Sequence, residues 1–172
     1  TDKQKYLKMK KKILITGSSG FIGFHLAKKL LEKGNKVHGY DSMNDYYDVR
    51  LKENRYKILK KNKNFSFTKN KLENKRILEG VFKKFKPNVV IHLAAQAGVR
   101  YSIEKPRVYL DSNITGTYNI IEVSKKVNVK HLIMASSSSV YGANKKFPFQ
   151  EIDKTDHQVS FYAATKKSTE NL

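Results

Sequence analysis

The chain contains no cysteine and no tryptophan, and only three of its 172 residues are proline. The absence of cysteine excludes a disulfide framework and any metal site built on thiolates. The histidines have no partner at metal-ligand spacing either, so we expect no bound metal. No apolar run approaches the length of about 20 residues that a membrane-spanning helix needs. We therefore expect no membrane partner and a soluble, cytoplasmic protein.

Acidic residues are also scarce, 15 against 35 lysines and arginines, which gives a formal net charge of +20. Such a charge is one signature of nucleic-acid binding. The basic residues here are scattered and mostly lysine, a pattern that favours solvated helix faces, so we expect no nucleic-acid partner. Part of this charge suits an anionic small-molecule substrate. We divide the chain into a basic extension, 1–11, and one globular domain, 12–172.

Three glycines follow the apolar segment 12–16 at the spacing G-x-x-G-x-x-G, and an amphipathic helical pattern begins directly after them. A strand, a glycine turn and a helix in this order bind a pyrophosphate at the helix N-terminus. Gly17 should make the tight turn, Gly20 should let the backbone approach the phosphates, and Gly23 should let the helix pack on the strand. The alternative is an ordinary turn that happens to contain three glycines.

An acidic residue, Asp41, ends the next expected strand, 18 residues after Gly23. A carboxylate at this place accepts hydrogen bonds from the ribose hydroxyls of an adenosine and repels a 2′-phosphate. No arginine follows directly to compensate for that repulsion, so the sequence predicts NAD rather than NADP as the cofactor. The alternative is a surface aspartate that caps a turn.

Apolar strand segments alternate with helical segments along the chain, which predicts an α/β fold with a doubly wound parallel sheet. Long loops are expected at 96–102 and about 143–160, beyond strand ends where ligands bind in such sheets. His92 is expected in the core. The expected strands are 12–16, 36–40, 64–68, 89–95 and 130–135, and the expected helices are 21–33, 49–59, 73–85, 106–127 and 161–172. The apolar positions of helix 106–127 are Val108, Leu110, Ile114, Tyr118 and Ile121.

Tyr162 and Lys166 form a Y-x-x-x-K pair on the last expected helix, where positions four apart share a face. A phenol, with an ordinary pKa of about 10, is a poor base at neutral pH, and a nearby cation favours its phenolate form. The serine run 136–139 offers a hydroxyl at a neighbouring strand end to orient a reacting oxygen. The alternative is a chance pairing of tyrosine with lysine.

Together these features resemble the extended short-chain dehydrogenase/reductases, most closely the UDP-glucuronate 4-epimerases among the nucleotide-sugar epimerases. The resemblance extends over nearly the whole chain after about Lys10. It implies a Rossmann-type NAD-binding domain. The segments that carry it are 13–27, 44–48 (Asn-Asp-Tyr-Tyr-Asp), 92–102 (with Gln-Ala-Gly-Val-Arg), 135–142 and 162–167.

The resemblance also assigns roles by position. It implies that Tyr162 is the base and Lys166 its partner, and that Ser137, or Ser138 as the second choice, contacts the sugar 4-hydroxyl. The implied substrate-binding residues are Gly98, Val99, Arg100 and Ser137. The implied cofactor-binding residues are Gly17, Gly20, Phe21, Ile22, Gly23, Asp41, Leu72, Leu93, Ala94, Ala95, Asn113, Tyr162 and Lys166. One departure is Lys71, where the family usually has an acid that holds the adenine.

The implied reaction is NAD-dependent epimerisation at C4 of a UDP-sugar, from UDP-glucuronate to UDP-galacturonate, through a 4-keto intermediate. Decarboxylation is the nearest alternative, because that intermediate is a β-keto acid. A dehydratase is less favoured, because Ser138 and Ser139 stand where that group has an acid pair. An inactive NAD-binding fragment is a further alternative. Family members are about twice as long, so we expect a chain that is truncated within this domain, with the substrate domain largely absent and the family's homodimer impaired.

Overall fold

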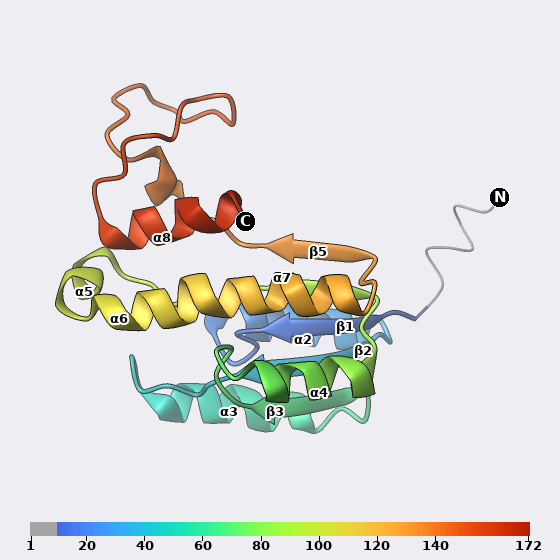
Figure 1. The fold of residues 1–172 in the computed structure, drawn as a ribbon. Helices are drawn as coiled ribbons and strands as arrows, with labels where there is room; N and C mark the ends of the chain where they lie inside the picture. The colour runs from blue at the N-terminus through green and yellow to red at the C-terminus, as the bar shows by residue number, and fades with distance from the viewer. Residues whose placement is uncertain (1–9) are drawn as a thin grey trace.

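Residues 10–172 are described by the computed structural model, so most of the predicted basic extension lies outside the described residues. Five strands form one sheet in the order β3-β2-β1-β4-β5, and every neighbouring pair is parallel (Figure 1). The strands are β1 (Lys12–Thr16), β2 (Lys36–Asp41), β3 (Phe65–Lys69), β4 (Val89–His92) and β5 (His131–Met134). The predicted doubly wound parallel sheet is confirmed.

Helices cover both faces of this sheet, and the residues of β1 show why. Ile13 and Ile15 pack in a cluster with residues of α2 (Phe21–Glu32) and α3 (Val49–Lys60). Leu14, which points to the other face, packs with residues of α4 (Lys75–Phe85) and α7 (Gly116–Lys126). Figure 1 shows α4 and α7 on the near face. A strand that is apolar on both faces is typical of parallel sheets between two helical layers.

The strand predicted over 89–95 ends at His92, so the second half of that prediction is wrong. The Thr16 hydroxyl accepts hydrogen bonds from the amides of Leu93 and Ala94, at 3.2 and 3.1 Å. The turn at Gly17 then lies directly against the backbone of Ala94. Residues 93–95 are apolar, like β4, because they pass under the glycine turn, but they no longer pair with a neighbouring strand.

The helix predicted over 106–127 forms, but it contains a π-helical turn and buries a different face. It consists of α6 (Pro106–Tyr109), the π-helical η1 (Leu110–Thr115) and α7. The predicted apolar positions Val108, Leu110 and Tyr118 are exposed. Mostly small, polar and aromatic residues are buried instead, together with Ile120 and Val123, and Gly116 allows the helix to approach the loop after β3, where a Cβ would press on Leu72. The buried residues are Tyr109, Asn113, Gly116, Thr117, Asn119, Ile120, Val123 and Ser124.

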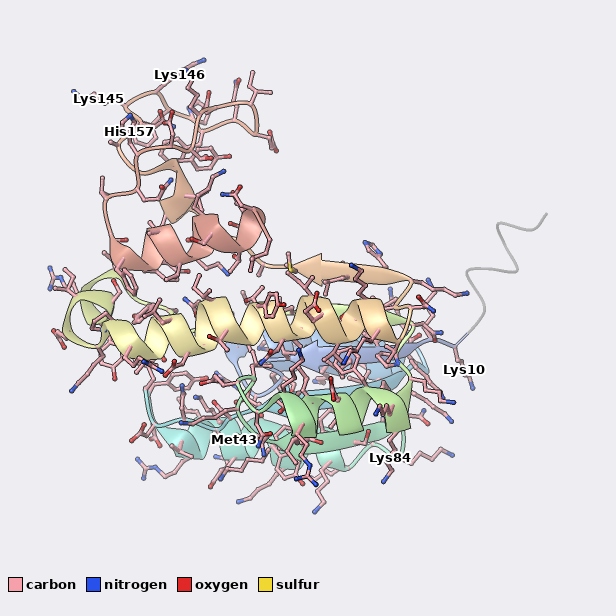
Figure 2. The ribbon with its side chains drawn as sticks, in the orientation of Figure 1. Lys10, Met43, Lys84, Lys145, Lys146 and His157 are labelled. Atoms are coloured by element: carbon pink, nitrogen blue, oxygen red, sulfur yellow. The ribbon has the colours of Figure 1, made fainter. Side chains whose placement is uncertain are left out.

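The last third of the described chain contains fewer regular elements. The predicted loop 96–102 is wrong in part, because its second half forms the short helix α5 (Val99–Glu104). After β5 come the 3-10 turn η2 (Ser138–Tyr141), a long loop and α8 (Phe161–Glu170). Figure 2 shows Lys145, Lys146 and His157 of this loop far from the sheet. Among the described residues no helix has both the length and the apolar character required to cross a membrane.

Candidate functional site

The turn between β1 and α2 excludes side chains at all three glycines of the motif. Gly17 has a φ of +71°, and a Cβ there would lie 2.9 Å from the amide nitrogen of Ala94. A Cβ on Gly20 would lie 3.1 Å from the carbonyl oxygen of Gly17, and one on Gly23 would overlap that oxygen. The turn therefore has the geometry that a bound pyrophosphate needs, with backbone rather than side chains facing the helix N-terminus.

Asp41 ends β2 beside this turn, as predicted, and only 7% of the residue is exposed. One oxygen accepts from the amide of Ser19 and the other from the amide of Met43, each at 2.9 Å. These two bonds fix the carboxylate at the edge of a cavity that it helps to line. A carboxylate oxygen has more than one acceptor site, so Asp41 retains capacity for ribose hydroxyls.

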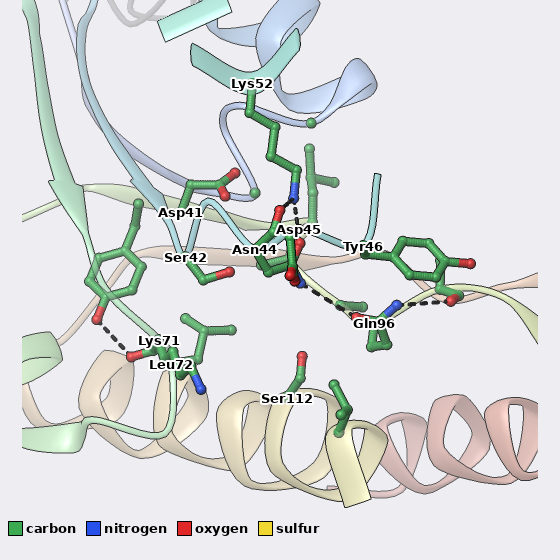
Figure 3. Close-up of a pocket in the computed structure, with 18 of the residues that line it drawn as sticks. Asp41, Ser42, Asn44, Asp45, Tyr46, Lys52, Lys71, Leu72, Gln96 and Ser112 are labelled. Atoms are coloured by element: carbon green, nitrogen blue, oxygen red, sulfur yellow. Dashed lines mark hydrogen bonds between the residues drawn. The ribbon is translucent and has the colours of Figure 1, made fainter. Parts of the chain in front are cut away.

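The cavity, about 380 Å³ in volume, lies at the carboxyl end of the sheet between β2 and the loops that follow β3 and β4 (Figure 3). Parallel sheets bind ligands at this edge, where the connections to either side diverge. Lys71, the departure from the family pattern, also borders the cavity, next to Asn70. Seven of the predicted cofactor-binding residues line it, namely Gly17, Gly20, Asp41, Leu72, Leu93, Ala94 and Ala95.

The other predicted cofactor residues lie outside the lining of this cavity. Phe21 and Ile22 start α2 with largely exposed side chains, while Gly23 lies beneath the turn.

The neighbouring hydroxyls of Ser18 and Ser19 are buried without a hydrogen-bond partner in the described part of the chain. Buried polar atoms normally have partners, so these two hydroxyls retain unused hydrogen-bonding capacity at the glycine turn.

His92 closes β4 beneath the cavity and is fully buried, as predicted for a core residue. The Thr16 hydroxyl accepts from two amides, so its own hydrogen points to Nδ1 of His92, 2.7 Å away. Nε2 then donates to the hydroxyl of Thr117 at 3.0 Å. Burial, with a smaller contribution from Lys166, lowers the pKa of His92 to about 3. The imidazole is therefore a neutral structural link, and residues 10–172 contain no cluster of His and acidic residues suited to a metal.

Tyr162 and Lys166 lie one turn apart on α8, which the Ser160 side chain caps by accepting from the amide of Ala163. Lys166 is buried, and its ammonium donates to the carbonyl oxygen of Ala135 at 2.5 Å. Burial lowers the pKa of Lys166, and the Glu170 carboxylate partly opposes this change. The two side chains thus share one face of α8, as expected from their spacing, and the ammonium of Lys166 is directed toward the end of β5.

Asn113, in the π-helical turn, connects the loop after β4 with α8. Its side chain exchanges two hydrogen bonds with the backbone of Gln96, at 2.7 and 3.1 Å. Its amide also donates to the hydroxyl of Thr165, which in turn donates to the carbonyl oxygen of Tyr162. Insertion of a π turn redirects side chains from a regular helix, and here it aims one amide at two other segments. Asn113 therefore positions the Tyr162 helix rather than lining the cavity.

Of the two predicted serines, Ser137 caps η2 and Ser138 is its first residue. The Ser137 hydroxyl accepts from the amide of Ser139 at 3.2 Å, and Ser138 is exposed. In residues 10–172 no hydrogen bond joins either serine to Tyr162, whose amide instead donates to the Ser102 hydroxyl at 3.2 Å. The structure thus places these serines and Tyr162 on adjacent segments without a direct link.

The predicted sugar loop adopts a defined geometry. Gly98 has a φ of +100°, and a Cβ there would overlap the hydroxyl of Tyr46. The buried Tyr109 phenol donates to the carbonyl oxygens of Ala97 and Gly98 at 2.7 and 2.5 Å. Val99 and Arg100 form the first turn of α5 with exposed side chains. Gly98 is thus required by backbone geometry, and the other two remain available to a ligand.

Several residues around the cavity were not predicted from the sequence. Lys52 is buried although it lies on a strongly charged helix, and Gln96 borders the cavity through both its backbone and its side chain. Arg55 donates to the carbonyl oxygen of Ser19 in the glycine turn and to the Tyr47 hydroxyl. The segment 44–48 carried a family signal, but the lysine and arginine of α3 carried no periodic signal that separates them from solvated neighbours.

A model of the GDP-mannose 4,6-dehydratase family matches residues 14–172. Among curated proteins, Protein CapI of Staphylococcus aureus is 61% identical over 159 residues, which cover 92% of this chain and 47% of that protein. UDP-glucuronate 4-epimerase of Thermodesulfobacterium geofontis is 49% identical over 159 residues, with coverage of 92% and 49%. The chain thus spans about half the length of the curated relatives it matches.

Solved structures show the same architecture. UDP-glucose 4-epimerase from Bifidobacterium longum, in complex with NAD+ and UDP, matches with a TM-score of 0.82 and 32% identity over 93% of this chain and 47% of that one. UDP-glucuronic acid 4-epimerase from Bacillus cereus, in complex with NAD and UDP-4-deoxy-4-fluoro-glucuronic acid, matches with a TM-score of 0.81 and 32% identity, covering 93% and 50%.

Proposed function

The chain belongs to the GDP-mannose 4,6-dehydratase family, and from this premise we propose that it binds NAD and supplies the catalytic tyrosine of a nucleotide-sugar epimerase. The observation that carries the proposal is the cavity lined by the glycine turn and Asp41, whose lining residue Gln96 is joined through Asn113 to the helix that bears Tyr162 and Lys166. Relatives named as epimerases, and neighbours solved with NAD, support the same proposal.

The residues of the cavity fit a nicotinamide dinucleotide. The glycine turn folds tightly against the backbone of Ala94, in a form that its own backbone contacts deny to larger residues, and the adjacent helix N-terminus favours the negative charge of a pyrophosphate. Asp41 would accept from the ribose hydroxyls, and Leu72, Leu93, Ala94 and Ala95 would face the rest of the molecule. When bound, the oxidised cofactor supplies a hydride acceptor for the sugar carbon.

The remaining chemistry belongs to residues of the chain. Tyr162 would take the proton of the sugar 4-hydroxyl, and Lys166 would favour the phenolate by its positive charge. Ser137 would hold the reacting oxygen once its hydroxyl leaves its present capping role, and the exposed Ser138 is the second choice. The sugar loop, Gly98 to Arg100, would contact the pyranose ring.

For the substrate we propose UDP-glucuronate, converted at C4 to UDP-galacturonate. Two observations support this choice: relatives that carry the UDP-glucuronate 4-epimerase name, and a neighbour solved with a fluorinated UDP-glucuronic acid. Dehydration is less favoured because the exposed Ser138 offers no acid. Decarboxylation shares every residue named above, so product analysis has to separate it from epimerisation.

The test is incubation of the full-length gene product with NAD and UDP-glucuronate. We expect UDP-galacturonate, identified by chromatography and NMR, and release of carbon dioxide would favour the decarboxylase instead. Tyr162→Phe should lower kcat about a thousandfold, the scale of general base catalysis, while NAD binding weakens by no more than about tenfold, the scale of one lost hydrogen bond. Tyr118→Phe, at an exposed tyrosine of α7, is the matched control and should retain full activity.

Comparable rates for Tyr162→Phe and the wild type would remove the tyrosine from its proposed role. Failure of the wild-type protein to bind NAD, measured by calorimetry, would contradict the cofactor assignment itself.

A further inference from the structure

Lys52 is a buried cation in α3, whose other charged residues are exposed except for the half-buried Arg55. Only 5% of this residue is exposed. Its ammonium donates to the main-chain carbonyl oxygen of Asn44 at 2.7 Å and to the side-chain oxygen of the same residue. It also lies 4.5 Å from the centre of the Tyr47 ring, within cation–π range. One lysine of α3 thus fixes both ends of the segment 44–47, which we call the strap.

The strap forms one border of the cofactor cavity (Figure 3). Across the cavity, the Asn44 amide donates to the side-chain oxygen of Gln96 at 3.4 Å. Gln96 is held in turn by Asn113. The two sides of the cavity are therefore joined by one long hydrogen bond, while both flanking contacts are short. If this connection opens, the weakest contact is the one between Asn44 and Gln96.

Aromatic contacts extend the strap in the same direction. The Tyr46 ring lies 5.0 Å from the ring of Tyr101 on α5, and its hydroxyl lies against Gly98. Burial lowers the pKa of Lys52, whereas Asp41 and Asp45 raise it. These two carboxylates therefore help to keep the ammonium charged while it is withdrawn from water.

We propose that Lys52 is a positioning residue that latches the strap across the cavity and thereby slows release of the bound dinucleotide. The proposal rests on the NAD binding proposed above. Lys52 acts through Asn44: its two hydrogen bonds hold the asparagine where its amide reaches Gln96. An enzyme that returns a hydride to the same sugar it was taken from benefits from a cofactor that does not leave in between.

The experiment measures cofactor kinetics in the full-length protein. NADH is bound, and its displacement by excess NAD is followed by stopped-flow fluorescence. Lys52→Met keeps the apolar stem of the side chain and removes its charge and its donors. Hydrogen bonds to charged groups contribute roughly 1.5–3 kcal/mol, so we expect NADH to dissociate at least about tenfold faster. The association rate should change much less than the dissociation rate, by under about threefold.

Lys57→Met is the matched control, because it removes the same charge from an exposed position of the same helix. Its dissociation rate should equal that of the wild type. If Lys52→Met lowers only the melting temperature, or slows association without faster dissociation, Lys52 merely supports the fold and the latch is overturned. A wild-type protein that binds no dinucleotide overturns the proposed function and the latch together.

A double-mutant cycle with Asn44→Ala tests the route of the effect. Since Lys52 is proposed to act through Asn44, the double variant should release NADH no faster than about twice the rate of the quicker single variant. Fully multiplied rate increases would show that Lys52 acts on the cofactor independently of the strap, which overturns the latch.

Discussion

The strands β1 and β2 and the edge strand β5 differ sharply in how deeply their side chains are buried. On the side of β1 and β2, residues such as Leu14 and Ile15 are completely buried, and both large hydrophobic clusters lie there or around β4. On the other side, β5 exposes 43% of Ile133 and 37% of Met134. The proposed cofactor contacts therefore rest mainly on a packed core, whereas the Tyr162 helix lies beside a strand that is open to solvent.

This second region is held largely by polar contacts. Lys166 reaches the backbone of Ala135, Thr165 bonds to Asn113, and Ser136 donates to Glu170 at 2.6 Å. Single hydrogen bonds contribute about 1 kcal/mol each, much less than the burial of a core side chain. We infer that the part built on β1 and β2 is the more stable one and that α8 opens first. The predictions below test the difference in packing on which this inference depends.

The largest expected effect is at Gly23 in α2, where a Cβ would overlap the carbonyl oxygen of Gly17. Gly23→Ala should lower the free energy of unfolding by about 3 kcal/mol or more, because backbone has to move to accommodate the methyl group. Gly80→Ala in α4 is the control, since a Cβ there meets nothing within 4 Å. It should stabilise the protein by about 0.5–1 kcal/mol. Urea unfolding measures both, and equal effects would contradict the steric argument.

The next effect compares the two sides of the sheet directly. Leu14→Ala removes a fully buried side chain from β1 and should lower the free energy of unfolding by about 3 kcal/mol. Ile133→Ala removes a half-exposed side chain from β5 and should cost less than about 1 kcal/mol. Urea unfolding followed by circular dichroism checks both. A loss at Ile133 as large as that at Leu14 would show that β5 is packed as tightly as β1.

The same contrast explains which features could be predicted from the sequence. The glycine turn and Asp41 were placed correctly because their signals are local: the spacing of three glycines and an acid at a strand end. The sheet itself followed from the alternation of apolar strands with helices. The family resemblance was confirmed by the comparisons, while the roles of the individual site residues remain predictions.

The features that were mispredicted depend on contacts between distant segments. The end of β4 is determined by Thr16, 76 residues before His92. The buried face of helix 106–126 contains Asn113 and Thr117, polar residues whose partners lie on β4, its following loop and α8. Lys52 is buried because the strap supplies its acceptors. No hydrophobic pattern indicates such burial, since the side chains concerned are polar.

The smallest expected effect is a pH dependence that originates in the buried half. His38 in β2 is hydrogen-bonded to Ser66 and Thr68, and burial, assisted by Lys84, lowers its pKa to about 4. The unfolded chain, with a pKa near 6.5, binds the proton more readily, so stability falls as pH drops below about 6.5. Between pH 7 and pH 5 this group should cost about 2 kcal/mol. His38→Gln should reduce the difference in unfolding free energy between these two pH values by that amount. An unchanged difference in urea titrations would place the acid sensitivity outside β2.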